Sequence, residues 1–125
     1  MKAIIQRVRE ASVSVDNKVI GEINHGLLIY LGIIKGDTEK EVNNLAKKIA
    51  NYRVFPDENY RMNKSLLDVK AEALIISQFT LAAEGKKGNR PSFDKAMQPR
   101  EAVILYEKFI EDLKSFNIKV STGEF

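Results

Sequence analysis

The feature that most constrains the fold is an uninterrupted apolar run, LLIYLGI, at residues 27–33. It follows the turn-forming pair His25-Gly26, and it has the length of a strand rather than of a typical helix. Because apolar residues occupy successive positions, the run predicts a central strand that is buried on both faces. Residues 74–79, with the sequence LIISQF, predict a second central strand. Helices or further strands must then cover the sheet that these two strands form.

Shorter strand patterns flank these two runs, at residues 4–9, 11–15, 19–23 and 118–121. The pair Asp16-Asn17 supplies turn chemistry between the second and third of these strands. Residues 54–69 contain a strong turn signal at positions 56–59 but no period that predicts a regular element. We therefore expect that segment to be irregular.

Two helices are predicted from capping signals and apolar stripes. Thr38 and Glu41 form a capping-box pair. The stripe that follows them consists of Val42, Leu45, Ala46 and Ile49. Pro99 suits the first turn of the second helix. The stripe of that helix consists of Val103, Tyr106, Phe109, Ile110 and Leu113. The element order predicts an α+β fold, in which two main helices pack on one face of a mixed β-sheet.

Composition excludes several classes of function. The chain has no cysteine, so it has neither disulfides nor thiolate metal sites, as is typical of proteins in a reducing cytosol. His25 is the only histidine and no compact carboxylate cluster accompanies it, so we expect no metal, no cofactor and no functional role for His25. No apolar run approaches the ~20 residues that cross a bilayer, and residues 1–7 lack a signal-peptide pattern, so we expect no membrane association and a cytoplasmic location.

The candidate site follows the second central strand. Ser77, Gln78 and Thr80 place two hydroxyls and an amide at the end of an apolar run, while the alternation of a strand assigns Phe79 to the core. Thr80 is a nucleophile only if a base lies beside it. Otherwise its hydroxyl either bonds local backbone or orients a substrate, and we favour orientation. Gln78 can bind an ester or a ribose without a charge, and backbone N–H groups beyond a strand end can form an oxyanion hole.

A basic loop comes next. Lys86, Lys87 and Arg90 lie within five residues of one another, which suits a phosphate-bearing substrate, although a solvated surface loop is the alternative. The net charge of +3, from 20 Lys+Arg against 17 Asp+Glu, is too small to indicate nucleic-acid binding by itself. Phe93 either lines a pocket or fixes the loop to the core. Arg7, inside the first strand, either reaches solvent or holds carbonyls and a carboxylate near the site.

Segments distributed along the whole chain resemble the D-aminoacyl-tRNA deacylases: MKAIIQRV at 1–8, GLLIYLG at 26–32, KGD at 35–37, MNKSL at 62–66, SQFTL at 77–81 and RPSF at 90–93. The resemblance implies a mixed, strongly curved β-sheet with two main helices packed on it. It also implies cytosolic homodimers that hydrolyse the ester between a D-amino acid and the 3′-terminal ribose of tRNA, and also mischarged glycyl-tRNA. An aminoacyl ester is already activated, so positioning and an oxyanion hole can suffice without a strong base.

The resemblance also implies roles for the residues of the candidate site. Ser77, Gln78, Phe79 and Thr80 match the catalytic strand of the family. Backbone groups around Phe79 and Thr80 would meet the ester, Gln78 would meet the terminal adenosine, and the hydroxyl of the tRNA ribose would assist the reaction. Arg7 matches a first-strand arginine that steadies a motif from the partner subunit.

The remaining matches concern the binding of the tRNA. Pro91 and Phe93 would shape the wall on the adenine side. Lys86, Lys87 and Arg90 would meet phosphate, by charge rather than by motif. The expected partners are therefore aminoacyl-tRNA and a second copy of the chain.

One departure separates the chain from the family. Members continue into a last strand bearing a Gly-Pro pair that enters the neighbouring site and rejects L-amino acids, whereas residues 1–125 contain no Gly-Pro dipeptide. We expect one deacylase domain without its last strand, whether residues follow Phe125, the gene product is shortened, or the chain is a variant. A non-catalytic tRNA-binding module and a broader threonine-dependent ester hydrolase are the alternative functions.

Overall fold

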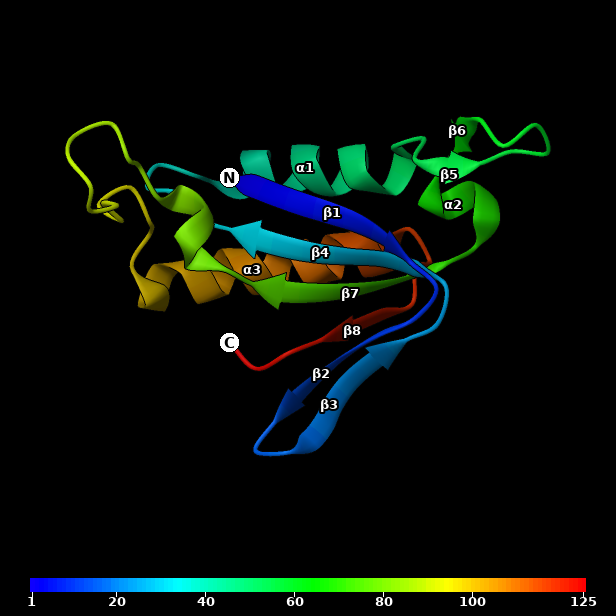
Figure 1. The fold of residues 1–125 in the computed structure, drawn as a ribbon, viewed down its shortest axis with the longest axis horizontal. Coiled ribbons are helices and arrows are strands. Elements are labelled where there is room, and N and C mark those ends of the chain that lie inside the picture. The colour runs from blue at the N-terminus through cyan, green and yellow to red at the C-terminus, as the bar shows by residue number, and fades with distance from the viewer.

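A four-stranded mixed sheet in the order β1-β4-β7-β8 forms the centre of the computed structural model, which describes residues 1–125 (Figure 1). The central strand β4 (Gly26–Gly32) pairs antiparallel with β1 (Lys2–Val8) and parallel with β7 (Glu72–Ser77). On the far side of β7, β8 (Val120–Thr122) runs parallel to it. The expected α+β fold with a mixed sheet is confirmed.

The hairpin at the N-terminal end gives the sheet its strong curvature. β1 and β2 (Ala11–Val15) follow each other with a bend at residues 9–10, and their antiparallel partners β3 (Lys18–Ile23) and β4 bend at residues 24–25. Figure 1 shows the β2–β3 arm turned away from the rest of the sheet. The predicted turn Asp16-Asn17 has φ angles of 50° and 64°, as the tight turn of a hairpin requires.

Gly21 permits the close approach of this arm to the sheet. A Cβ atom at Gly21 would lie 2.5 Å from the carbonyl oxygen of Thr122, so any other residue would push β3 away from β8. The hydroxyl of Ser121 also donates to the carbonyl oxygen of Glu22 at 3.0 Å. The arm therefore covers the β8 side of the sheet and leaves the β1 side open.

The two long helices, α1 (Glu39–Asn51) and α3 (Pro99–Ser115), pack on one face of the sheet and against each other (Figure 1). The capping box of α1 is present, because the Thr38 amide donates to the Glu41 carboxylate at 2.7 Å and the Thr38 hydroxyl accepts from the Lys40 amide at 3.2 Å. The core beneath the helices includes the fully buried side chains of Leu27, Ile29, Leu31, Val42, Phe55, Leu66, Ile75, Phe109 and Leu113.

Two predictions about regular elements are wrong. β4 is fully buried on its helix side only; Leu28 and Tyr30, on the other face, are half-buried because no helix covers them. The segment 54–69 is not irregular, since it contains the short strands β5 (Phe55–Pro56) and β6 (Met62–Lys64) and the helical turn α2 (Leu66–Val69). None of the helices has both the length and the apolar character that crossing a membrane requires.

Candidate active site

The end of β7 is shaped by its contact with β4. The strand was predicted to continue to Phe79, but it ends at Ser77 and a 3-10 helix, η1 (Phe79–Ala82), follows. The Gln78 amide still donates to the carbonyl of Leu31 at 2.8 Å, after which the chain turns over Gly32. A Cβ atom at Gly32 would lie 2.9 Å from Cβ of Leu81 and 3.0 Å from the carbonyl oxygen of Gln78. The missing side chain at Gly32 therefore lets η1 pack on the end of β4.

The hydroxyl of Thr80 is held by its neighbour. Nε2 of Gln78 donates to Oγ1 of Thr80, and Thr80 is exposed to solvent. An amide N–H that donates to a hydroxyl oxygen removes no proton from it, so this contact does not activate Thr80 as a nucleophile. It leaves the Thr80 O–H free to donate outward. The arrangement therefore suits a group that orients a substrate.

Two backbone amides lie beside that hydroxyl. The N–H groups of Phe79 and Thr80 are the first two of η1, and such groups have no acceptor inside their own helix. No side chain caps this turn. Uncommitted amides next to an oriented hydroxyl are the donors that stabilise a developing oxyanion.

A pocket of about 530 Å³ opens between the end of β7, η1 and the start of α3, and Ser77, Phe79 and Phe93 line part of it. The rings of Phe79 and Phe93 meet edge to face, with centroids 5.6 Å apart. Phe79 is 58% exposed, so its assignment to the core is wrong. The strand alternation behind that assignment stops applying where η1 begins. Phe93, which is 39% exposed, belongs to the pocket wall.

The basic loop is closed at its base by a pair of backbone hydrogen bonds. Glu84 and Ser92 donate to each other's carbonyls, both at 2.8 Å, and the exposed residues between them include Lys86, Lys87, Arg90 and Pro91. Lys95 forms an ion pair with Glu84 at 2.6 Å. The hydrogen bond from Lys95 is the main reason why the pKa of Glu84 is lowered, and the charges of Lys86 and Lys2 add to it. Lys86, Lys87 and Arg90 form no ion pair with a carboxylate.

Comparison with known proteins identifies the family of the chain. The sequence model of the family described as D-Tyr-tRNA(Tyr) deacylase matches residues 4–125. The chain belongs to this deacylase family. The D-aminoacyl-tRNA deacylase of Fusobacterium nucleatum subsp. nucleatum is 58% identical over 125 residues, which are 100% of this chain and 83% of that protein. The D-aminoacyl-tRNA deacylase of Persephonella marina is 55% identical, again over 100% of this chain, and over 84% of its own length.

Solved structures share the fold of the chain. The chain matches the structure named c-Myc DNA Unwinding Element Binding Protein with a TM-score of 0.93 and 40% identity, over 100% of this chain and 85% of the other. A probable eukaryotic D-amino acid tRNA deacylase gives a TM-score of 0.77 at 17% identity, over 91% of this chain and 67% of that one. At that identity the second match shows the fold alone.

Arg7 lies apart from Ser77 within this deacylase chain. It is paired with Leu27, at the start of β4, whereas Ser77 is paired with Leu31, at the opposite end of that strand. The exposed Arg7 side chain donates to the carbonyl of Val54. Within one chain it therefore holds a carbonyl far from the Ser77 end of the sheet.

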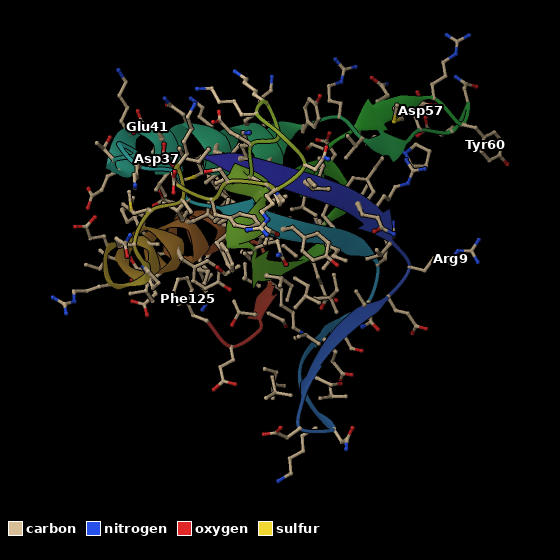
Figure 2. All side chains as sticks on the ribbon, turned by 60° about the vertical axis from the view of Figure 1, so that its left-hand side comes forward. Arg9, Asp37, Glu41, Asp57, Tyr60 and Phe125 are labelled. Carbon is tan, nitrogen blue, oxygen red and sulfur yellow. The ribbon has the colours of Figure 1, made fainter.

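Sequence reasoning missed part of the pocket of the deacylase. Its wall also includes Met97, Gln98, Ala102, Glu124 and Phe125. Phe125, labelled in Figure 2, stacks at a tilt on Tyr106 with ring centroids 5.2 Å apart. Because β7 and β8 are parallel, residues that follow them reach the same edge of the sheet. The pairing of β7 and β8, which sequence patterns did not reveal, brings Phe125 to the end of β7.

The sole histidine has a structural contact in this deacylase. The ring of His25 meets the ring of Phe55 edge to face, with centroids 5.2 Å apart. No group of three or more His, Asp or Glu side chains is placed to hold a metal ion.

Proposed function

We propose that this protein hydrolyses the ester bond of D-aminoacyl-tRNA and releases free tRNA and the D-amino acid, as quality control in translation. The family match and relatives at 50–58% identity that carry the name D-aminoacyl-tRNA deacylase support this function. One observation carries the mechanism: the Gln78 amide holds the Thr80 hydroxyl beside two backbone amides that have no acceptor within η1. This arrangement positions an ester without a strong base.

Water attacks the ester. The water oxygen bonds to the ester carbonyl carbon, the bond from that carbon to the ribose oxygen breaks, and the proton of the water passes to the ribose oxygen. The neighbouring hydroxyl of the same ribose is the group that relays this proton. The amides of Phe79 and Thr80 stabilise the negative carbonyl oxygen, and one such donor contributes about 10²–10³ in rate. The Thr80 hydroxyl orients the ester.

We assign the pocket to the binding of the terminal nucleotide of the tRNA. Phe79, Phe93 and Phe125 supply aromatic surface to a space of about 530 Å³, which suits a flat base. Gln78 is engaged with Thr80, so we assign it to the orientation of that hydroxyl and leave the base to the aromatic wall. Pro91 does not line the pocket, and its role at the adenine side is limited to the shape of the loop. Glycyl-tRNA, which has no side chain to exclude, is a second expected substrate.

The binding of the remaining tRNA is assigned to the basic loop. Lys86, Lys87 and Arg90 are exposed and have no carboxylate partner, so they are free to contact phosphate. We assign Arg7 to the site of the neighbouring subunit, because Arg7 and Ser77 of the same chain lie at opposite ends of β4.

We propose that the working form is a homodimer in the cytoplasm. The sheet face opposite the helices is apolar on the β1 side: Ile4 is 54% exposed, and Leu28, Tyr30 and Ile76 are half-buried. A second copy would remove this surface from water. The expectation that residues 1–125 form one deacylase domain without its last strand stays a prediction.

The function is tested with one tRNA charged either with D-tyrosine or with L-tyrosine. Loss of the D-ester alone supports a chirally selective deacylase, and loss of both esters supports an ester hydrolase without the selectivity. If the chain binds tRNA but hydrolyses neither ester, the non-catalytic module replaces the proposal. Thr80→Ser should retain activity and Thr80→Ala should lose most of it. A trapped acyl-enzyme in the unmodified protein would instead assign Thr80 as a nucleophile.

A further inference from the structure

A lysine from the first strand lies beside the site. Lys2 pairs directly with Gly32, the residue over which η1 packs, and β1 is in contact with η1. Ala3 and Ile5 pack toward the core, so the alternation of β1 directs Lys2 to the face that carries η1. Figure 1 shows the start of β1 next to the helical turn that follows β7. Lys2 therefore lies next to η1, the turn that contains Phe79 and Thr80, without being part of that segment.

The charges around this lysine are unbalanced. Glu84 is the nearby carboxylate, and Lys95 already pairs with it at 2.6 Å. Lys2 and Lys86 come from different elements, yet both lie near enough to Glu84 for their charges to lower its pKa. Neither lysine has an ion-pair partner of its own. Two cations without ion-pair partners thus lie near Glu84, which follows η1 by two residues.

We propose that Lys2, together with Lys86, binds a phosphodiester of the single-stranded 3′ end of tRNA next to the nucleotide that bears the ester. The inference rests on the proposed function, and it adds a strand residue to the basic loop. A single-stranded end suits the geometry, because its flexible backbone can pass from the loop across η1 while the terminal base enters the aromatic pocket. A lysine on an edge strand can also serve only to prevent edge-to-edge pairing, and that role predicts no effect on RNA.

The test measures binding of uncharged tRNA at several salt concentrations. Removing one phosphate contact should lower the slope of log K against log[salt] by about 0.7, which is about fivefold weaker binding at 0.1 M salt. We expect this loss for Lys2→Gln and a near-normal slope for Lys2→Arg. Lys47→Gln is the matched control, because Lys47 is an exposed lysine on the outward side of α1. In hydrolysis, Lys2→Gln should raise KM and leave kcat unchanged.

The outcomes separate this inference from the function that it presupposes. An unchanged slope for Lys2→Gln, with normal hydrolysis of D-tyrosyl-tRNA by the unmodified protein, overturns the role of Lys2 and leaves the deacylase standing. A reduced slope without any hydrolysis supports the phosphate contact and overturns the deacylase. If the unmodified protein binds tRNA with no salt dependence and hydrolyses no D-tyrosyl-tRNA, both are overturned.

Discussion

Replacing Gly32 by alanine tests whether the packing of η1 on β4 controls the reaction. The new Cβ atom would lie 2.9 Å from Cβ of Leu81 and 3.0 Å from the carbonyl oxygen of Gln78, which is closer than real Cβ contacts. Gly32 itself is held by its pairing with Lys2 in β1, so the turn has to move instead. Overpacking of this kind costs about 1–3 kcal/mol of unfolding free energy.

The displaced turn carries the amides of Phe79 and Thr80. A misplacement of about 1 Å at a reacting centre can lower the rate about 10²-fold, so we expect a loss of that order in kcat for D-tyrosyl-tRNA. Thermal unfolding followed by circular dichroism gives the cost in stability, and single-turnover hydrolysis gives the loss in rate.

The control for Gly32→Ala is Gly85→Ala in the basic loop. No atom lies within 4 Å of the Cβ position at Gly85, so that variant should unfold and react like the unmodified protein. Two results would refute the reasoning. Normal stability of Gly32→Ala would mean that η1 does not pack on β4 as described, and reduced stability with normal kcat would mean that this packing does not position the reacting groups.

Three further predictions concern other contacts. Gln78→Met keeps the side-chain volume but removes the donor to Thr80, so it should lower kcat about as much as Thr80→Ala and leave tRNA affinity unchanged in a binding assay. Ile4→Glu places a charge on the open sheet face, and light scattering should show that it shifts a dimer toward monomer, whereas a mass of one chain for the unmodified protein would contradict the dimer. Lys95→Met removes the main cause of the lowered pKa of Glu84, so an NMR titration should show that pKa rise. The pair stabilises the fold above the ordinary pKa of Glu84 and ceases to do so as the pH falls through the lowered value, and an unshifted titration in the variant would contradict it.

The long elements were predictable because their signals are local. Thr38 and Glu41 specify where α1 begins, and Asp16-Asn17 specify the hairpin turn, whatever the rest of the chain does. The end of β7 was not predictable in the same way. Whether the strand continues to Phe79 depends on the room above Gly32, which is fixed only when β4 and β7 are paired.

The residues of the candidate site were only partly predictable, because only some of them have local signals in the sequence. Ser77, Gln78 and Thr80 are consecutive or nearly so, and their polarity after an apolar run marks them in the sequence. Met97 precedes α3 and Phe125 follows β8, so only the tertiary arrangement brings them to Ser77. The apparent burial of Phe79 followed from extending a strand period beyond the strand.

Glu84 and Ser92 exchange two backbone hydrogen bonds, which form a clip at the base of the basic loop. Because of this clip, the length and charge of the loop can change independently of the position of Phe93. Because two hydrogen bonds of 2.8 Å fix both ends of the loop, the position of Phe93 just after the clip does not depend on the residues inside it. Doubling the length of a flexible loop costs only about 0.6 kcal/mol, so insertions here are inexpensive. Changes in the length and charge of this segment can therefore leave the pocket unaltered. The same position offers a place to graft a foreign RNA-binding loop onto the hydrolase.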